Sequence, residues 1–105
     1  MPIKNKKLKF STKTIHVGNK IDDTGATVTP LHLSSTFKQP GFSSSEKFVY
    51  SRTGGPTIDA LEENFRMLEN SKYSFAFGSG MAAMTAIFLM FKPGDHVLIS
   101  KNVYG

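Results

Sequence analysis

The residues best suited to chemistry in this chain form a short glycine and serine turn. Gly78-Ser79-Gly80 separates an aromatic segment at 73–77 from an apolar segment that begins at Met81. If a strand precedes the turn and a helix follows it, the helix start exposes unpaired N–H groups and favours negative charge. Glycine lets a phosphate approach the backbone closely, and Ser79 can cap the helix or donate to a phosphate oxygen. The turn therefore predicts an anion site, with a tight turn that binds nothing as the alternative.

A second ligand class fits the same turn. Gly78-x-Gly80-x-x-Ala83 matches the glycine fingerprint of dinucleotide-binding proteins. That fingerprint also requires an acid about 20 residues later, at the end of the second strand, to hold the ribose. The second strand, which we expect at 96–100, ends at Ser100-Lys101-Asn102, and Asp95 lies at its other end. A Rossmann-type dinucleotide binder is therefore the weakest alternative, although Lys101 could in principle meet a 2′-phosphate.

The elements that would position this turn predict an α/β fold. Apolar residues recur at helical spacing after Gly55-Pro56, which predicts a helix over roughly 56–69. Tyr73–Phe77 then reads as a strand, Met81 to about Phe91 as a helix that is buried on several sides, and His96–Ser100 as a second strand. Strand, helix and strand within about 30 residues make a βαβ unit, which we expect to be right-handed.

The lysine-rich start of the chain carries the excess of positive charge. The net charge is +5, and residues 1–20 contain six lysines and no acid. We interpret residues 1–20 as a basic arm in solvent rather than a nucleic-acid-binding segment, because no aromatic residues alternate with the lysines. Residues 21–55 are irregular, with β-prone stretches near 26–28 and 48–50. A loop of that length indicates a functional segment or one that packs on another chain.

Several function classes are excluded or disfavoured. The chain has no cysteine, so neither a disulfide nor a thiolate metal site can form. His16, His32 and His96 stand alone without a partner at ligand spacing, so we predict no metal site. No apolar run reaches the roughly 18–20 residues of a membrane span, and the start of the chain lacks a secretory signal. We expect a cytoplasmic protein that binds neither a membrane nor nucleic acid.

Short blocks spread over most of the chain add a more specific signal. Tyr50-Ser51-Arg52-Thr53-Gly54-Gly55-Pro56-Thr57 looks like a Y-S-R-x-x-N-P-T block, and Phe77-Gly78-Ser79-Gly80-Met81-Ala82-Ala83 contains S-G-M-A-A. The other blocks are Thr24-Gly25-Ala26, Thr29-Pro30-Leu31, Ser34-Ser35-Thr36-Phe37, Gly94-Asp95 and Tyr104-Gly105. In this order and at this spacing they resemble the Cys/Met-metabolism family of pyridoxal-phosphate (PLP) enzymes. That family includes cystathionine γ-synthase, cystathionine γ-lyase, cystathionine β-lyase, methionine γ-lyase and O-acetylhomoserine sulfhydrylase.

The resemblance implies a role for each matching site residue. Gly80 and Met81 would offer backbone N–H groups to the PLP phosphate, with Ser79 beside them. Tyr50 and Arg52 would reach the phosphate of a neighbouring subunit, where the planar fork of arginine suits two phosphate oxygens. Tyr104 would be the catalytic residue of this segment, since it would stack on the pyridine ring near the reacting carbon and could relay a proton.

The resemblance also implies the architecture and what the chain lacks. The fold would be the N-terminal, incomplete part of a fold-type I, aminotransferase-like PLP enzyme. Residues 21–55 would pack on the neighbouring subunit, and residues 56–105 would begin the large PLP-binding α/β domain. The lysine that forms the Schiff base lies well downstream of Gly105 in the family. Ser11-Thr12-Lys13 resembles the serine/threonine-lysine context of that site, but it precedes every cofactor element, so we reject Lys13 as the Schiff-base lysine. One departure is Gly55, where the family has asparagine.

The implied function is trans-sulfuration chemistry. We expect a fragment of an enzyme that catalyses β/γ-elimination or γ-replacement on cystathionine, homocysteine or homoserine esters, closest to the γ-lyase and γ-synthase branch. The full-length enzyme would be a homo-oligomer, a dimer of dimers, and this chain would be inactive alone. A non-catalytic truncated subunit or a pseudogene product is the alternative.

Overall fold

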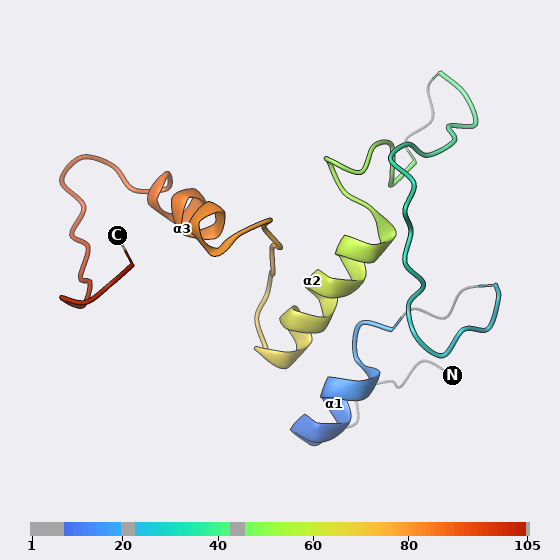
Figure 1. Ribbon diagram of the computed structural model, residues 1–105, viewed down its shortest axis with the longest axis horizontal. Helices are drawn as coiled ribbons and strands as arrows, with labels where there is room; N and C mark the ends of the chain where they lie inside the picture. The colour runs from blue at the N-terminus through green and yellow to red at the C-terminus, as the bar shows by residue number, and fades with distance from the viewer. Residues whose placement is uncertain (1–7, 20–22, 43–45, 105) are drawn as a thin grey trace.

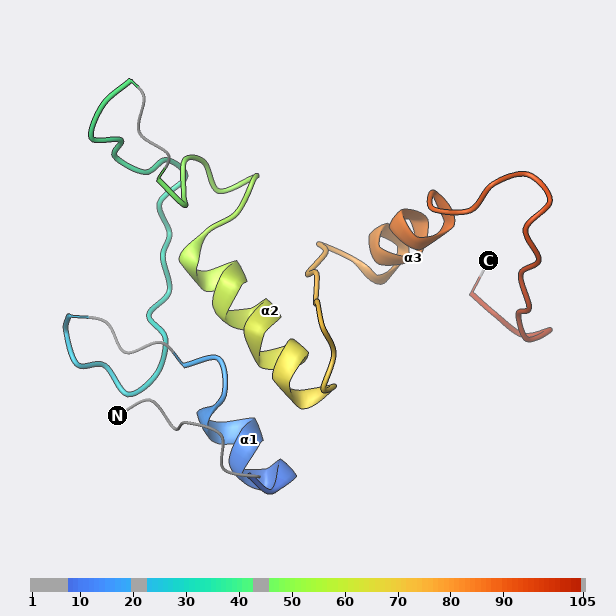
Figure 2. The same ribbon diagram turned by 180° about the vertical axis from the view of Figure 1, so that it is seen from behind.

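The computed structural model describes residues 8–19, 23–42 and 46–104, and these residues contain three helices. Helix α1 spans Phe10–His16, α2 spans Pro56–Leu68 and α3 spans Gly80–Phe88 (Figure 1). Helices α1 and α2 contact each other, whereas α3 lies well away from both in the two opposite views (Figures 1 and 2). The radius of gyration is 17.8 Å, against about 13 Å for a compact domain of this size. The molecule is therefore open.

Helix α2 forms as its sequence predicts. Gly55 is the N-cap in an extended conformation, and Pro56 occupies the first helical position, where its missing N–H costs nothing. The helix ends at Leu68, after which Asn70 adopts a φ of +51°. The N–H of Ser71 then donates to the carbonyl of Arg66 at 3.0 Å, which is the 6→1 bond of a Schellman motif. The helix predicted over roughly 56–69 is confirmed.

Helix α3 is also confirmed, with a shorter end than predicted. The hydroxyl of Ser79 accepts from the N–H of Ala82 at 3.1 Å and so caps the helix start. The predicted end near Phe91 is wrong by three residues, because the last turn tightens after Phe88. There the N–H groups of Met90 and Phe91 donate to carbonyls three residues back.

The predicted basic arm contains α1, which the sequence did not indicate. Directly after α1, the side-chain amide of Asn64 donates to the carbonyl of Val17 at 2.7 Å. Gly18 has a φ of +76°, and a Cβ built there would lie 2.7 Å from the carbonyl oxygen of Ala60. The close approach of the two segments therefore requires glycine. The arm's Lys4, Lys6, Lys7 and Lys20 lie outside the described residues, as does Gly105.

Extended chain runs beside α2 after this contact (Figure 1). The N–H of His32 donates to the hydroxyl of Thr57 at 2.9 Å, and the hydroxyl of Thr29 donates to the carbonyl of Gly18 at 3.3 Å. Of the two β-prone stretches, the one at 48–50 takes part in an antiparallel bridge between Thr36 and Tyr50. The stretch at 26–28 forms no strand.

The two predicted strands are not formed in this chain. Tyr73–Phe77 and His96–Ser100 have no strand pairing, so the sheet of the predicted α/β fold is absent from the described residues. A strand needs a neighbour for its N–H and C=O groups, and parallel strands are stable where both faces of the sheet are covered. Strands that follow one another along the chain are also not always neighbours in a sheet. The helix between these two segments is confirmed, but their direct pairing as a βαβ unit is wrong here.

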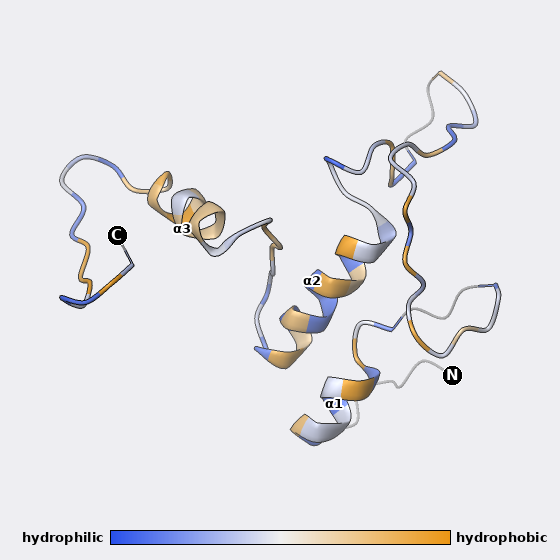
Figure 3. Ribbon diagram, viewed as in Figure 1, coloured by the Kyte–Doolittle hydropathy of each residue, from blue (hydrophilic) through white to orange (hydrophobic). Residues whose placement is uncertain are grey.

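Little apolar surface is buried. Among the described hydrophobic residues, Val17 and Ala60 are buried, with 7% and 8% of their surface exposed. The apolar stripe of α2 remains largely exposed, and Leu98 is 99% exposed. Figure 3 shows hydrophobic colour over most of α3 and on one side of α2. None of the helices in the described segments is both long and apolar enough to cross a bilayer.

Candidate anion-binding site

The start of α3 presents backbone donors to open space. No described residue accepts a hydrogen bond from the N–H of Gly80 or Met81, which are the first two of the helix. A Cβ built on Gly78 or Gly80 would meet no atom within 4 Å, so an anion has room to approach the backbone. The hydroxyl oxygen of Ser79 accepts a hydrogen bond from the N–H of Ala82, and the hydroxyl proton remains available to a ligand oxygen. These residues fit a phosphate group.

Tyr50 and Arg52 form a second cluster suited to an anion. The guanidinium carbon of Arg52 lies 5.0 Å from the centre of the Tyr50 ring, and its Nη2 donates to the phenol oxygen at 3.4 Å. Both side chains are exposed. No carboxylate in the described part of the chain pairs with Arg52, so its fork is available for a phosphate.

The other arginine of the chain shows the contrast. Arg66 donates two hydrogen bonds to Glu63, each of 2.7 Å. These hydrogen bonds, and then the nearby negative charge, raise the pKa of Arg66. The charge of Arg66 is therefore paired within α2, whereas no carboxylate of the described residues pairs with Arg52.

One copy of the chain does not bring the two clusters together. Tyr50 and Arg52 directly precede the N-terminal end of α2, whereas Ser79 lies beyond its C-terminal end, after the connection at 69–78. Both views show α3 separated from the start of α2 (Figures 1 and 2). A ligand that needs both clusters would therefore need two copies or a large rearrangement.

Tyr104, the predicted catalytic residue, is 80% exposed. No described aromatic ring packs on it, and its end of the chain lies on the α3 side of the molecule (Figure 1). The face of this tyrosine ring is thus accessible to a flat ligand.

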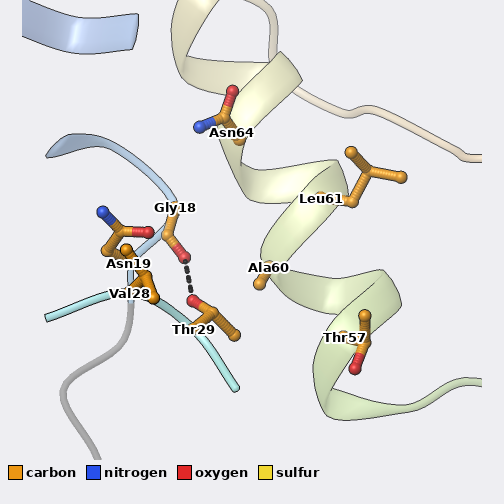
Figure 4. A pocket seen from close by; sticks show the side chains of 8 residues that line it. All are labelled: Gly18, Asn19, Val28, Thr29, Thr57, Ala60, Leu61 and Asn64. Carbon is orange, nitrogen blue, oxygen red and sulfur yellow. Dashed lines mark hydrogen bonds between the residues drawn. The ribbon is translucent and has the colours of Figure 1, made fainter. Parts of the chain in front are cut away.

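A cavity of about 260 Å³ lies elsewhere, between α2 and the segments after α1 (Figure 4). It is lined by Gly18, Asn19, Val28, Thr29, Thr57, Ala60, Leu61 and Asn64. The lining has no charged side chain, and its polar groups bond to the backbone, as Thr29 does to Gly18. We interpret this cavity as a packing gap. Sequence reasoning did not single out Asn64, because an isolated polar residue on a helix carries no long-range signal.

No cluster of three or more histidine or acidic side chains suited to a metal ion occurs in residues 8–19, 23–42 and 46–104. The ring of His32 faces the carbonyl of Pro30, with Nδ1 3.2 Å from the oxygen. The three histidines belong to different segments of the chain.

Comparison with known proteins shows the relationship that these features suggest. The family of Cys/Met metabolism PLP-dependent enzymes matches residues 11–105. A cystathionine β-lyase of Lactococcus lactis is 43% identical over 97 residues, which are 91% of this chain and 26% of that enzyme. A cystathionine γ-lyase of Bacillus subtilis is 43% identical over 99 residues, which are 93% of this chain and 26% of that enzyme.

Solved structures show the same relationship. The metB protein of Corynebacterium glutamicum superposes with a TM-score of 0.78 at 44% identity, over 86% of this chain and 24% of that one. The chain thus spans about a quarter of the length of the relatives that it matches. Since the family match covers nearly all of the sequence, the predicted resemblance is confirmed, and the chain belongs to the Cys/Met metabolism PLP-dependent enzymes, whose cofactor is pyridoxal phosphate.

Proposed function

We propose that this chain supplies phosphate-binding elements of a PLP enzyme of sulfur amino-acid metabolism. The reaction would be β- or γ-elimination or γ-replacement on cystathionine, homocysteine or a homoserine ester. The family match and relatives named cystathionine β-lyase and γ-lyase support this chemistry. The observation that carries the proposal is the open pair of N–H groups on Gly80 and Met81 at a capped helix start.

Each residue at the start of α3 has a defined part in holding the cofactor. PLP, when bound, withdraws electrons from the carbon of the substrate that loses its proton. The N–H groups of Gly80 and Met81 donate to phosphate oxygens, and the Ser79 hydroxyl donates to a third. The positive end of α3 lowers the energy of the phosphate charge at this place.

Tyr50 and Arg52 serve the phosphate of a second copy in this proposal. The separation of the start of α2 from α3 within one copy (Figure 1) supports this arrangement, as does the arginine fork, which no carboxylate of the described residues occupies. The active assembly is then a homo-oligomer, and a dimer of dimers in the full-length enzyme. Tyr104 stacks on the cofactor ring and holds a proton on its hydroxyl near the reacting carbon.

The chain alone is catalytically inactive in this proposal. The enzyme to which it contributes is cytoplasmic. The resemblance implies that the lysine that binds the cofactor lies in a part of the enzyme outside the matched residues 11–105. The measurement is turnover of cystathionine by the isolated chain with added PLP. Clear turnover would show that the residues described here suffice, and this part of the proposal would be wrong.

Glycine 80 gives a direct test of the phosphate site. Gly80→Ala places a methyl group in the open space before the helix start, where nothing lies within 4 Å. We expect PLP to bind about 10-fold more weakly, through lost contacts to a charged group. Pyridoxal, which lacks the phosphate, should bind as before. Gly41→Ala, another glycine with open space around it, is the matched control. Unchanged PLP affinity in Gly80→Ala would contradict the site.

A further inference from the structure

Tyr50 belongs to a small hairpin that the sequence did not reveal. The N–H of Phe37 donates to the carbonyl of Val49 at 3.0 Å, and the N–H of Ser51 donates to the carbonyl of Ser35 at 2.9 Å. These bonds flank the antiparallel bridge between Thr36 and Tyr50. We call the two arms at 35–37 and 49–51 the clamp hairpin. Its second arm leads directly into Arg52.

A tight turn fixes Arg52 relative to the hairpin. The carbonyl of Tyr50 accepts from the N–H of Thr53 at 2.9 Å and from the Thr53 hydroxyl at 2.8 Å. The turn reverses the chain over residues 50–53, so that Arg52 returns over the ring of Tyr50. The orientation of the arginine thus depends on where the second arm of the hairpin lies.

Gln39 closes the clamp hairpin on the loop side of the bridge, where the chain leaves the first arm and enters the second. Its side-chain nitrogen donates to the carbonyl of Phe48 at 2.9 Å and to the carbonyl of Phe37 at 3.2 Å. A side-chain amide carries two N–H donors on one nitrogen, which suits two carbonyls, one at the end of the first arm and one directly before the second. The rings of Phe37 and Phe48 also pack, with centres 5.6 Å apart. Gln39 is half-buried, so its hydrogen bonds are partly shielded from water.

We propose that Gln39 is a positioning residue for phosphate binding, because its amide closes the clamp hairpin and holds Arg52 over Tyr50 before the ligand arrives. The proposal rests on the proposed function, in which Tyr50 and Arg52 bind the cofactor phosphate. A long arginine in solvent loses side-chain freedom when it binds, and a support that orders it beforehand removes part of that loss.

The test is a double-mutant cycle in the full chain, read as a ratio of two affinities. Binding of PLP and of pyridoxal is followed by fluorescence, and the ratio of their dissociation constants reports the phosphate contacts alone. Arg52→Ala should reduce the preference for PLP about 10- to 100-fold. Gln39→Met keeps the side-chain size but removes the amide, and should reduce the preference about 3- to 10-fold. Together with Arg52→Ala, it should produce no further loss.

The matched control separates positioning from stability. Asn64→Leu removes another side-chain amide that bonds to a backbone carbonyl, at Val17, away from the clamp hairpin. It should lower the unfolding midpoint and leave the preference for PLP unchanged. Gln39→Glu is a second variant of the same size, whose ionised side chain cannot donate to either carbonyl. It should reproduce the effect of Gln39→Met.

The outcomes distinguish this inference from the function on which it rests. If Arg52→Ala leaves the preference for PLP unchanged, the proposed phosphate role of Arg52 is wrong. If Arg52→Ala reduces it but the folded Gln39 variants do not, only the positioning role is overturned. An effect of Gln39→Met that persists in the Arg52→Ala background also overturns it. Unfolding of both Gln39 variants would assign the residue to general stability and reject the proposal.

Discussion

The two regions of this molecule differ in how far along the sequence their stabilising contacts reach. In the N-terminal region, which we define as the described residues of 8–68, side chains and backbone from distant positions bond to α2. The partners on α2 are Thr57, Asp59 and Asn64. In the C-terminal region, residues 69–104, α3 is held by local bonds, and the flanking segments leave Leu98 and other large side chains in solvent. Segments that need neighbouring strands are the ones that remain open.

The comparison also explains why both candidate phosphate-binding clusters are formed. The start of α3 needs only Ser79 and the helix itself, so it forms without a sheet. Tyr50 and Arg52 need the clamp hairpin, which lies wholly within the N-terminal region. Each cluster is therefore organised by residues close to it, although the two lie apart.

The largest expected effect concerns the contact of Gly18 with α2. Gly18→Ala places a methyl group 2.7 Å from the Ala60 carbonyl oxygen at a φ of +76°, so strain and overpacking add. We expect a loss of about 3 kcal/mol in the free energy of unfolding, measured with urea. Gly25→Ala is the matched control, because its φ is +72° but nothing lies within 4 Å. It should cost about 1 kcal/mol. Equal losses in both variants would show that the close approach does not stabilise the N-terminal region.

The next effect breaks a connection between the two regions. The carboxylate of Glu62 in α2 accepts from the N–H of Ala76 at 2.9 Å, in the segment that leads into the glycine turn. Glu62→Leu should leave this N–H unpaired and cost about 1–2 kcal/mol, seen as faster hydrogen exchange at Ala76. Glu62→Gln keeps an acceptor oxygen and should retain most of the protection. If the amide of Ala76 exchanges equally fast in both variants, the carboxylate charge rather than the hydrogen bond connects the regions.

Local sequence signals predicted α2, α3 and the glycine and serine turn that precedes α3, but not α1. Pro56 with its acidic first turn, and Ser79 between two glycines, each act within a few residues, so their effects can be read from the sequence. The strands at 73–77 and 96–100 were predicted from apolar composition, which indicates a buried segment but does not supply the neighbour that must pair with it. The same pattern placed the end of α3 three residues too late.

Long-range contacts gave no sequence signal. The bonds from Asn64 to Val17 and from Gln39 to Phe48 each join a single polar residue to a backbone carbonyl. Any polar side chain in solvent would look the same in the sequence. The positive φ of Gly18 was equally hidden, since glycine occurs at many open turns as well. The family blocks identified Tyr50 and Arg52, but the hairpin that holds them was visible only in the structure.

A smaller effect tests the open character of the C-terminal region. Leu98 is 99% exposed, so Leu98→Lys should change the unfolding free energy by less than about 0.5 kcal/mol and should reduce aggregation. Val17→Lys introduces the same charge at a position that is 7% exposed and should cost several times more. Urea unfolding and light scattering measure the two properties. A large loss from Leu98→Lys would mean that His96–Ser100 is covered in solution.

The smallest effect concerns Gly55, where the family has asparagine. The backbone of Gly55 is extended, with a φ of −167°, and a Cβ there would lie 3.8 Å from the ring of Phe37, an ordinary contact. Asparagine can cap α2 through its side chain, so Gly55→Asn should stabilise the chain by roughly 0.3 kcal/mol. Gly54→Asn is the matched control and should destabilise by about 1 kcal/mol, because its φ of +145° suits glycine alone. The two variants should shift the urea midpoint in opposite directions. A loss of stability in Gly55→Asn would show that the packing of Phe37 over the start of α2 leaves no room for a capping side chain, so that the departure from the family maintains the contact between the clamp hairpin and α2.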